Sequence, residues 1–153
     1  MSAATRLVEL GIVLPEVVSP VGSYVPALRH GDLVYTSGQL PMVNGTLVAV
    51  GQLGGEVTAE QGAECARAAT LNALAAVAQA CGGIDNIVRV VRVVGYVAST
   101  PDFVSQPAVM NAGSNLLGDI FGESGRHVRS AIGVAALPLG APVEVELVVA
   151  VRG

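Results

Sequence analysis

The sequence predicts an α+β fold in which a mixed β-sheet carries two helices on one face. Three features lead to this prediction: an alternating β-type run at residues 143–151, a long apolar β-type run at 87–99, and helical patterns at 58–82 and 103–121. The elements follow the order β-β-(β)-α-β-α-β-β, so each long helix connects strands by a crossover, which is right-handed in nearly all proteins. A chain of 153 residues is large enough to bury a core and fits one domain.

The run at 143–151 has a period of two, as a strand with one buried face requires. Its polar face carries Glu144, whereas the apolar face consists of Val143, Val145, Leu147, Val149 and Val151. Residues 137–142 contain two prolines and a glycine and separate this run from a β-type segment that begins near Arg129. We therefore predict a hairpin with Arg129 and Glu144 on neighbouring strands. Charges in an apolar sheet need a partner or a ligand, so the two residues form either a structural ion pair or part of a binding site.

The helix at 58–82 has clear signals at both ends. Thr58 and Gln61 have the spacing of a capping box, and Gly82 ends the pattern. Small side chains recur at helical spacing and predict close packing on a sheet; they are Ala66, Ala69, Ala73, Leu74, Val77 and Cys81. Cys65 and Cys81 would lie about 24 Å apart along this helix, so no disulfide between them is expected.

The strand at 87–99 is apolar on both faces apart from Arg89 and Arg92. Two helices cover only one face of a full sheet, so the other face needs a second copy of the chain. The composition agrees, because 52% of the residues are hydrophobic and only 13% are charged. We therefore expect an oligomer, in which the two arginines line a central cavity or pair with glutamates across an interface.

The first half of the chain is less regular. Residues 1–19 are predicted to form an N-terminal extension with a short helix at 3–12, and 20–153 form the single domain. Short strands are expected at 24–28 and 33–37, with a further strand after the turn at Asn44-Gly45.

Composition excludes several classes of function. A net charge of −4 without a basic cluster argues against a nucleic-acid surface. The chain has no lysine, which excludes a lysine Schiff base and with it covalent pyridoxal phosphate chemistry. Two histidines and no Cys-x-x-Cys offer no recognisable metal site, so neither metal nor organic cofactor is expected. No apolar run reaches the roughly 18 residues of a membrane span, and no signal peptide is evident, so a cytoplasmic location is expected.

Several segments resemble one known family. The sequence Arg-Ser-Ala-Ile-Gly-Val-Ala-Ala-Leu-Pro at 129–138, followed by Val-Glu-Val-Glu at 143–146, resembles the C-terminal signature of the Rid family. These proteins are reactive intermediate deaminases, also called YjgF or L-PSP proteins. The segment at 33–41, which ends in Ser-Gly-Gln-Leu-Pro, is similar to another family motif, and the resemblance extends over about 20–152. It implies a chorismate-mutase-like fold and homotrimers whose sheets face a central barrel. It also implies that a small carboxylate or imine metabolite binds in clefts between subunits.

The resemblance also implies site residues. Arg129 matches the arginine that clamps the substrate carboxylate, a task that suits its planar fork. Glu144 matches the acidic residue associated with the attacking water, and partial burial would raise its pKa. The other implied substrate-binding positions are Tyr24, Ser37, Gly38 and Asn111.

Each implied position has a plain structural alternative. Tyr24 could serve only in packing, Ser37 and Gly38 could form a simple turn, and Asn111 could be an ordinary helix residue. Glu144 could be a solvated strand residue, as Glu146 on the same face suggests.

The sequence also departs from the family pattern. Ala131 stands where many deaminases have cysteine, and Gly133 stands where the common pattern has glutamate. Arg126-His127-Val128 replaces the usual Pro-Ala approach to the arginine, and His127 is a further candidate for the site. These differences indicate a divergent branch with an extended N-terminus.

The expected function is hydrolytic deamination of reactive enamines or imines, of the 2-aminoacrylate type, to 2-oxo acids and ammonia. The alternative is a non-catalytic trimeric binding protein for small carboxylates or 2-oxo acids. The ribonuclease activity historically attached to L-PSP proteins is disfavoured by the acidic charge balance.

Overall fold

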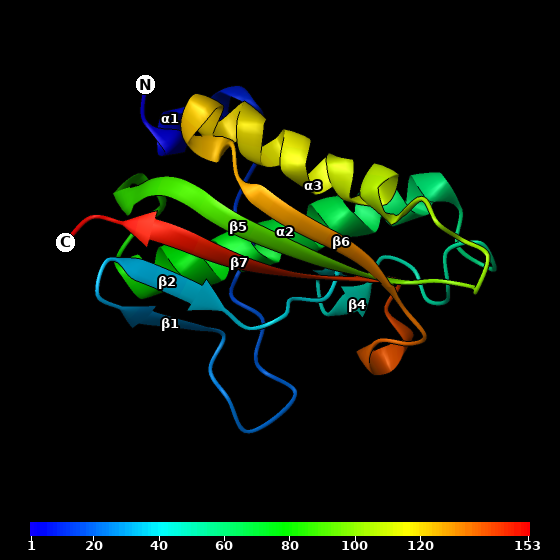
Figure 1. Ribbon diagram of the computed structural model, residues 1–153. Helices are drawn as coiled ribbons and strands as arrows, with labels where there is room; N and C mark the ends of the chain where they lie inside the picture. The colour runs from blue at the N-terminus through cyan, green and yellow to red at the C-terminus, as the bar shows by residue number, and fades with distance from the viewer.

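The computed structural model describes residues 1–153 and contains a five-stranded mixed sheet with a layer of helices on one face (Figure 1). The strand order is β1-β2-β7-β5-β6. In chain order the main elements are α1 (Ala3–Glu9), β1 (Ala27–His30), β2 (Leu33–Thr36), β3 (Met42–Val43), β4 (Thr46–Leu47), α2 (Ala59–Cys81), β5 (Ile87–Ala98), α3 (Gln106–Phe121), β6 (Val128–Val134) and β7 (Val143–Val151). Short 3-10 turns precede β5, β6 and β7. The predicted α+β class is confirmed.

The centre of the sheet is the antiparallel pair β5 and β7. Side chains alternate along β7 as predicted: all five apolar positions from Val143 to Val151 are buried, and the residues between them are half-buried. The buried side chains face α2, which lies behind the sheet in Figure 1. The core is therefore a single layer between the sheet and the two long helices.

The predicted hairpin between β6 and β7 is wrong. β6 pairs in parallel with β5, and β7 pairs antiparallel with the other side of β5, so β5 separates them. The connection at 135–142 carries the chain from the edge strand to the middle of the sheet. Its breakers do form a turn, with Leu139 at φ 61° and Gly140 at φ 75°, but a turn signal does not determine which strand comes next in space.

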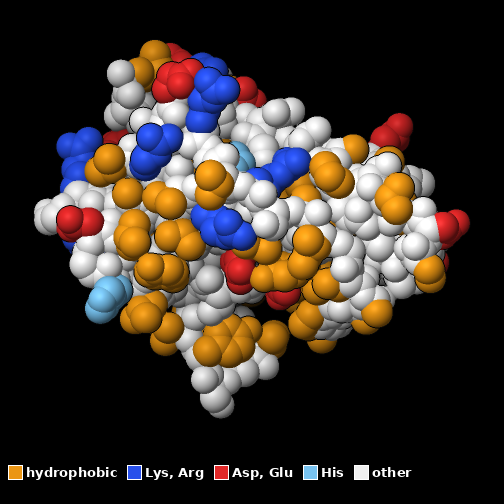
Figure 2. Space-filling view, viewed as in Figure 1, with side chains coloured by type: hydrophobic (Ala, Val, Ile, Leu, Met, Phe, Trp, Pro, Cys, Tyr) orange, Lys and Arg blue, Asp and Glu red, His pale blue; other side chains and the backbone are white.

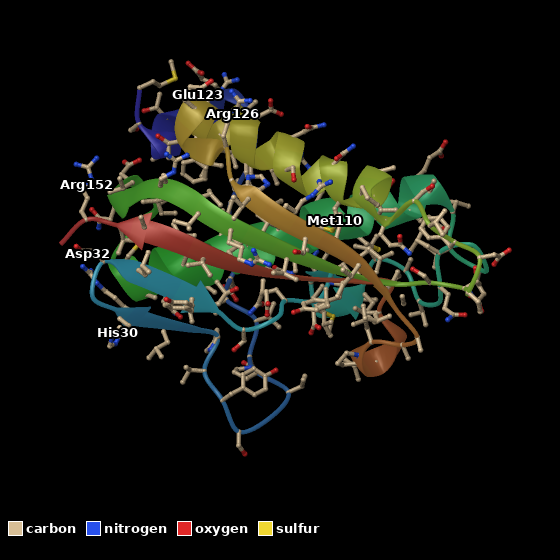
Figure 3. The ribbon with its side chains drawn as sticks, in the orientation of Figure 1. His30, Asp32, Met110, Glu123, Arg126 and Arg152 are labelled. Atoms are coloured by element: carbon tan, nitrogen blue, oxygen red, sulfur yellow. The ribbon has the colours of Figure 1, made fainter.

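Helix α2 begins and ends as predicted. Thr58 accepts a hydrogen bond from the Gln61 amide, Gln61 accepts one from the Thr58 amide, and Gly82 closes the helix at φ 84°. The predicted stripe of small residues is buried, and both cysteines are buried and free. Helix α3 starts at Gln106, three residues later than predicted, because residues 101–102 form a turn and 103–105 have no regular secondary structure. Met110 of α3 lies between the helix and the sheet, in the space that Gly95 leaves open (Figure 3).

The N-terminal segment packs on the body of the protein. Helix α1 is shorter than the predicted 3–12, because the chain turns at Gly11 with φ 68°. Leu7 is buried in the core, and the Arg6 Nε donates to the carbonyl of Asp119 at the end of α3, at 2.7 Å. The first strand begins at Ala27 rather than at residue 24.

The face of the sheet opposite the helices is open within one chain. Exposed hydrophobic side chains on it include Leu28, Tyr35, Val128 and Ile132. Figure 2 shows hydrophobic side chains across much of this face, with arginines among them and acidic side chains near its centre. An apolar sheet face of this kind marks a surface for association. No helix in the chain is both long and apolar enough to cross a membrane.

Candidate functional site

The predicted site residues form two groups in one chain. The first group is centred on Arg129, the second residue of edge strand β6. Arg129 lies beside Val93 of β5, whose side chain is fully buried, so the arginine points toward the helical face. Its Nη1 donates to Asn111 Oδ1 at 3.0 Å and to Ser114 Oγ at 3.1 Å, and its Nη2 donates to the Pro107 carbonyl at 3.4 Å.

These contacts leave one edge of the guanidinium free. A guanidinium has five N–H groups, and α3 engages both on Nη1 and one on Nη2. The Nε–H of Arg129 makes no hydrogen bond within the chain, and Nη2 has one N–H beyond its single contact with the Pro107 carbonyl. The Nε and Nη2 edge can therefore present a fork of two N–H groups. A fork of this kind is the arrangement that binds a carboxylate with two hydrogen bonds. Helix α3 therefore fixes the arginine without occupying its carboxylate-binding edge.

His127 and Ser114 extend the first group. His127 Nε2 lies 2.9 Å from Ser114 Oγ, and His127 Nδ1 lies 2.6 Å from the carbonyl oxygen of Gly125. His127 was predicted from the sequence as a further candidate for the site, whereas Ser114 was not. The sequence spacing could have indicated Ser114, because this residue follows Asn111 by three positions and so lies on the same face of the helix.

The second group lies beyond β2 and on β7. Ser37 and Gly38 follow β2, and Glu144 is the second residue of β7. A Cβ at Gly38 would come within 2.6 Å of Glu144 Cδ and 2.7 Å of Oε1, so only glycine leaves room for the carboxylate there. The Ser37 amide donates to the Pro26 carbonyl and its hydroxyl to the Val25 carbonyl, whereas the Gly38 amide makes no hydrogen bond within the chain. A free N–H thus lies beside a half-buried carboxylate.

Burial raises the pKa of Glu144 above its usual value of 4.5, and the nearby carboxylate of Glu146 raises it further. Glu146 accepts a hydrogen bond from the Tyr96 hydroxyl at 2.9 Å. The sequence pattern placed Glu146 on the same face as Glu144, but it did not predict Tyr96, because the antiparallel register that places Tyr96 opposite Glu144 is a long-range property of the sheet.

Tyr24 stands at the edge of the second group. Its side chain is 47% exposed and lines a small hollow together with Gly38 and Gln39. Gln39 is buried and forms a two-way backbone bridge with Val145, which attaches this loop to β7.

The two groups do not meet within one chain. Arg129 faces the helices, whereas Glu144 faces the open side of the sheet, and β5 lies between their strands. No ion pair joins them, and the ion pairs in the chain are Arg6–Glu9 and Arg126–Glu123. The alternative of a structural Arg129–Glu144 pair on adjacent strands is therefore also wrong for the single chain.

Gly133 and Ala131, the two positions that depart from the family motif on β6, both lie on the side of the strand that faces the helices. Gly133 faces α3, and a Cβ there would come within 2.7 Å of the Gln106 amide nitrogen, which donates to the Phe103 carbonyl and to Ser99. Ala131, also on this side of β6, packs against the core. No thiol lies here: Cys65 is buried inside α2, where burial and the charge of Glu64 raise its pKa to about 11.

The larger cavities lie elsewhere. One of about 880 Å³ lies between the N-terminal segment, the β3–β4 hairpin and α2, and none of the predicted site residues lines it. No group of three or more His, Cys, Asp or Glu side chains is placed to hold a metal ion. Arg89 and Arg92 contact the Arg126 carbonyl and the Ser130 hydroxyl and pair with no glutamate in the chain.

Comparison with known proteins agrees with this fold. The family model described as "YjgF/chorismate mutase-like, putative endoribonuclease" matches residues 4–151. Protein TCP17 of Trypanosoma cruzi is 41% identical over 147 residues, which cover 95% of this chain and 92% of that protein.

Two solved structures are also similar. The Agrobacterium tumefaciens protein Atu1372, of unknown function, is 40% identical with a TM-score of 0.91, and the match covers 98% of this chain and 92% of that one. A Shewanella oneidensis MR-1 protein, titled "putative endoribonuclease", is 36% identical with a TM-score of 0.94, and the match covers 99% of this chain and 100% of that one. Most of residues 1–19 therefore falls within the shared fold. The chain belongs to the YjgF/chorismate mutase-like family, to which the Rid proteins also belong.

Proposed function

We propose that the protein is a homotrimeric hydrolase that converts reactive enamines and imines of 2-oxo acids to the 2-oxo acid and ammonia. The observation that carries this proposal is the pair of half-sites. One offers the free fork of Arg129 for a carboxylate, and the other holds Glu144 in a partly buried position beside the free Gly38 amide. A site that needs both halves must be built from two protomers. The open apolar face of the sheet supports association, and closed rings are a common outcome of such contacts.

The chemistry assigns one role to each half. The Arg129 fork would hold the carboxylate of a 2-imino acid and orient its C=N carbon. Glu144, as carboxylate, would accept a proton from a water molecule as that water attacks this carbon. Return of the proton to nitrogen makes the amine a leaving group. As the C–N bond breaks and ammonia departs, the hydroxyl group of the intermediate gives its proton to the Glu144 carboxylate and becomes the carbonyl of the 2-oxo acid. An enamine first takes a proton on its terminal carbon and then follows the same route.

The second candidate is a trimeric protein that binds small carboxylates without catalysis. The absence of a thiol near Arg129, where Ala131 stands, favours it over a reaction that needs a nucleophilic sulfur. It uses the same Arg129 fork and has no need of Glu144.

A coupled assay tests the proposal. An amino acid oxidase generates 2-imino acids in situ, and semicarbazide traps the imine that survives. We expect the protein to lower the amount of trapped imine and to release ammonia, and Glu144→Ala to lose this effect while remaining an oligomer of unchanged size. If several imino acids show no acceleration, but carboxylates still bind in an Arg129-dependent way, the binding protein is the correct alternative.

Gly38→Ala is expected to reduce kcat/KM for imine hydrolysis by about tenfold or more, because the new Cβ displaces the Glu144 carboxylate. The backbone at Gly38 has no positive φ, so the alanine introduces no backbone strain. Gly118→Ala is the matched control, since a Cβ there meets nothing within 4 Å. Equal loss of activity in both variants, or none in Gly38→Ala, would contradict the role given to this glycine.

The raised pKa of Glu144 leads to a pH prediction. A general base must be ionised, so activity falls as pH decreases through the pKa of Glu144, and the acidic limb of kcat/KM should lie above pH 4.5. Glu146→Gln removes one cause of the raised pKa and retains an acceptor for Tyr96, so the limb should move to lower pH. A pKa raised by folding also means that ionising Glu144 lowers stability as pH increases through the same window. Glu123→Gln, at an exposed position, should leave the limb in place.

A further inference from the structure

A chain of hydrogen bonds continues from Arg129 into the body of the protein. Ser114 lies one turn after Asn111 on α3, and its hydroxyl accepts from Arg129 Nη1 at 3.1 Å. The same oxygen lies 2.9 Å from His127 Nε2, and His127 Nδ1 lies 2.6 Å from the Gly125 carbonyl oxygen. His127, Ser114 and Arg129 thus form one line between the Gly125 carbonyl, in the 3-10 turn before β6, and the candidate site.

The direction of every bond in this line follows from the Gly125 carbonyl. A carbonyl oxygen only accepts, so Nδ1 of His127 must carry the proton that bonds to it. In the neutral ring Nε2 is then an acceptor, and the Ser114 hydroxyl donates to it. The Ser114 lone pairs are thereby left for Arg129. The Nδ1–H tautomer of His127 sets the orientation of the serine, and the serine in turn holds the arginine.

The orientation of the Ser114 hydroxyl matters because a serine in a helix has a second hydrogen-bond acceptor within reach. A helical serine commonly donates to the carbonyl four residues earlier, and no other residue in the chain gives its hydroxyl a fixed direction. Asn111, the other side chain that contacts Nη1, is exposed. An arginine held only by an exposed amide keeps more of its rotamer freedom, which a bound carboxylate must then remove.

We propose that Ser114 and His127 are positioning residues that hold the guanidinium of Arg129 with its Nε–Nη2 fork directed at the ligand carboxylate. This inference rests on the proposed function only in taking the ligand to be a carboxylate; it does not require hydrolysis. The pair touches neither the ligand nor the reacting atoms. Its effect is to lower the cost of ordering the arginine when the ligand binds.

The tautomer of His127 is the first measurement. The chain contains two histidines, and His30 lies exposed on edge strand β1, at the other edge of the sheet, where it serves as an internal reference (Figure 3). Long-range ¹H–¹⁵N correlation spectra at about pH 8, where an ordinary imidazole is neutral, distinguish the two tautomers. We expect His127 in the Nδ1–H form. A predominantly Nε2–H ring at position 127 would overturn the directed chain.

Pyruvate affinity is the second measurement, made by calorimetry on variants of unchanged oligomeric state. Ser114→Ala and His127→Leu are each expected to weaken pyruvate binding by about tenfold, the range of one lost hydrogen bond. His127→Gln places an amide oxygen where it can accept from Ser114, so it should restore most of the affinity. His30→Leu is the matched control and should bind as the wild type does.

The outcomes separate this proposal from the proposed function. Wild-type affinity in both Ser114→Ala and His127→Leu would overturn the positioning role and leave the Arg129 site intact. Equal weakening by His127→Gln and His127→Leu would also overturn it, because a general packing defect would then explain both. If the wild type binds no pyruvate, the Arg129 site and its positioning pair fail together. Binding that follows the predicted pattern without imine hydrolysis would support the pair and reject the deaminase.

Discussion

Arg129→Ala is expected to reduce kcat/KM for imine hydrolysis by at least about 30-fold and to remove measurable pyruvate binding. A carboxylate held by a two-pronged guanidinium loses both charge-assisted hydrogen bonds in this variant, and truncating one partner of such a pair costs about 2–5 kcal/mol. Arg129→Lys should recover little, because a point charge replaces the fork and cannot keep the bonds to Asn111 and Ser114 while also holding the ligand. The coupled imine assay and pyruvate calorimetry measure the two effects.

Arg126→Ala is the matched control for this prediction. Arg126 lies three residues earlier, near the C-terminal end of α3, and forms a long ion pair with exposed Glu123 (Figure 3). The Arg126→Ala substitution removes the same charge from the same region of the protein and leaves the hydrogen bonds of Arg129 to Asn111 and Ser114 in place. Equal losses in Arg126→Ala and Arg129→Ala would point to a general electrostatic effect and contradict a specific clamp. A wild-type rate in Arg129→Ala would remove this residue from the site.

Local signals in the sequence predicted the parts of the fold that depend on neighbouring residues. The capping box at Thr58 and the glycine at position 82 set the ends of α2, because both act within one helical turn. The period-two pattern of β7 predicted its buried face for the same reason. Asn44 and Gly45 both adopt positive φ, as their dipeptide signal indicated.

The position of β6 in the sheet could not be predicted from residues near it in the sequence. Its connection to β7 contains turn residues typical of a hairpin, yet β6 pairs with β5 across the crossover that α3 makes. The choice depends on where α3 packs, which in turn depends on residues far apart in the sequence, such as Gly95 opposite Met110. The same long-range packing placed Ser114 beside His127 and Tyr96 beside Glu146, and neither contact has a local signal.

The family resemblance selected the site positions, and the structure shows how they are distributed. Arg129, Asn111 and His127 lie together on the helical side of β6. Gly38 and Glu144 lie together on the other side of the sheet, with Tyr24 and Ser37 in the adjoining loops. Sequence spacing could not reveal this division, because it arises from the face of the sheet that each strand residue occupies.

Mixing two inactive variants is expected to restore activity if each site takes Arg129 from one protomer and Glu144 from its neighbour. Arg129→Ala protomers keep Glu144, and Glu144→Ala protomers keep Arg129. In a cyclic trimer that contains both kinds, one of the three interfaces pairs the intact arginine with the intact glutamate, and the other two do not. Random exchange of equal amounts produces mixed rings in about three quarters of the trimers, so about a quarter of the wild-type activity should return.

The measurement is imine hydrolysis after the two variants have been dissociated and reassembled together, with each variant treated alone as the control. Native mass spectrometry of differently tagged chains reports the fraction of mixed rings, so the recovered rate can be compared with the number of restored interfaces. A mixture that contains mixed rings and remains inactive would place both residues in one protomer's site. That result would require a rearrangement of the sheet, because in one chain Arg129 and Glu144 face opposite sides of it with β5 between them. Recovery in proportion to the mixed rings is the outcome that the geometry of the chain predicts.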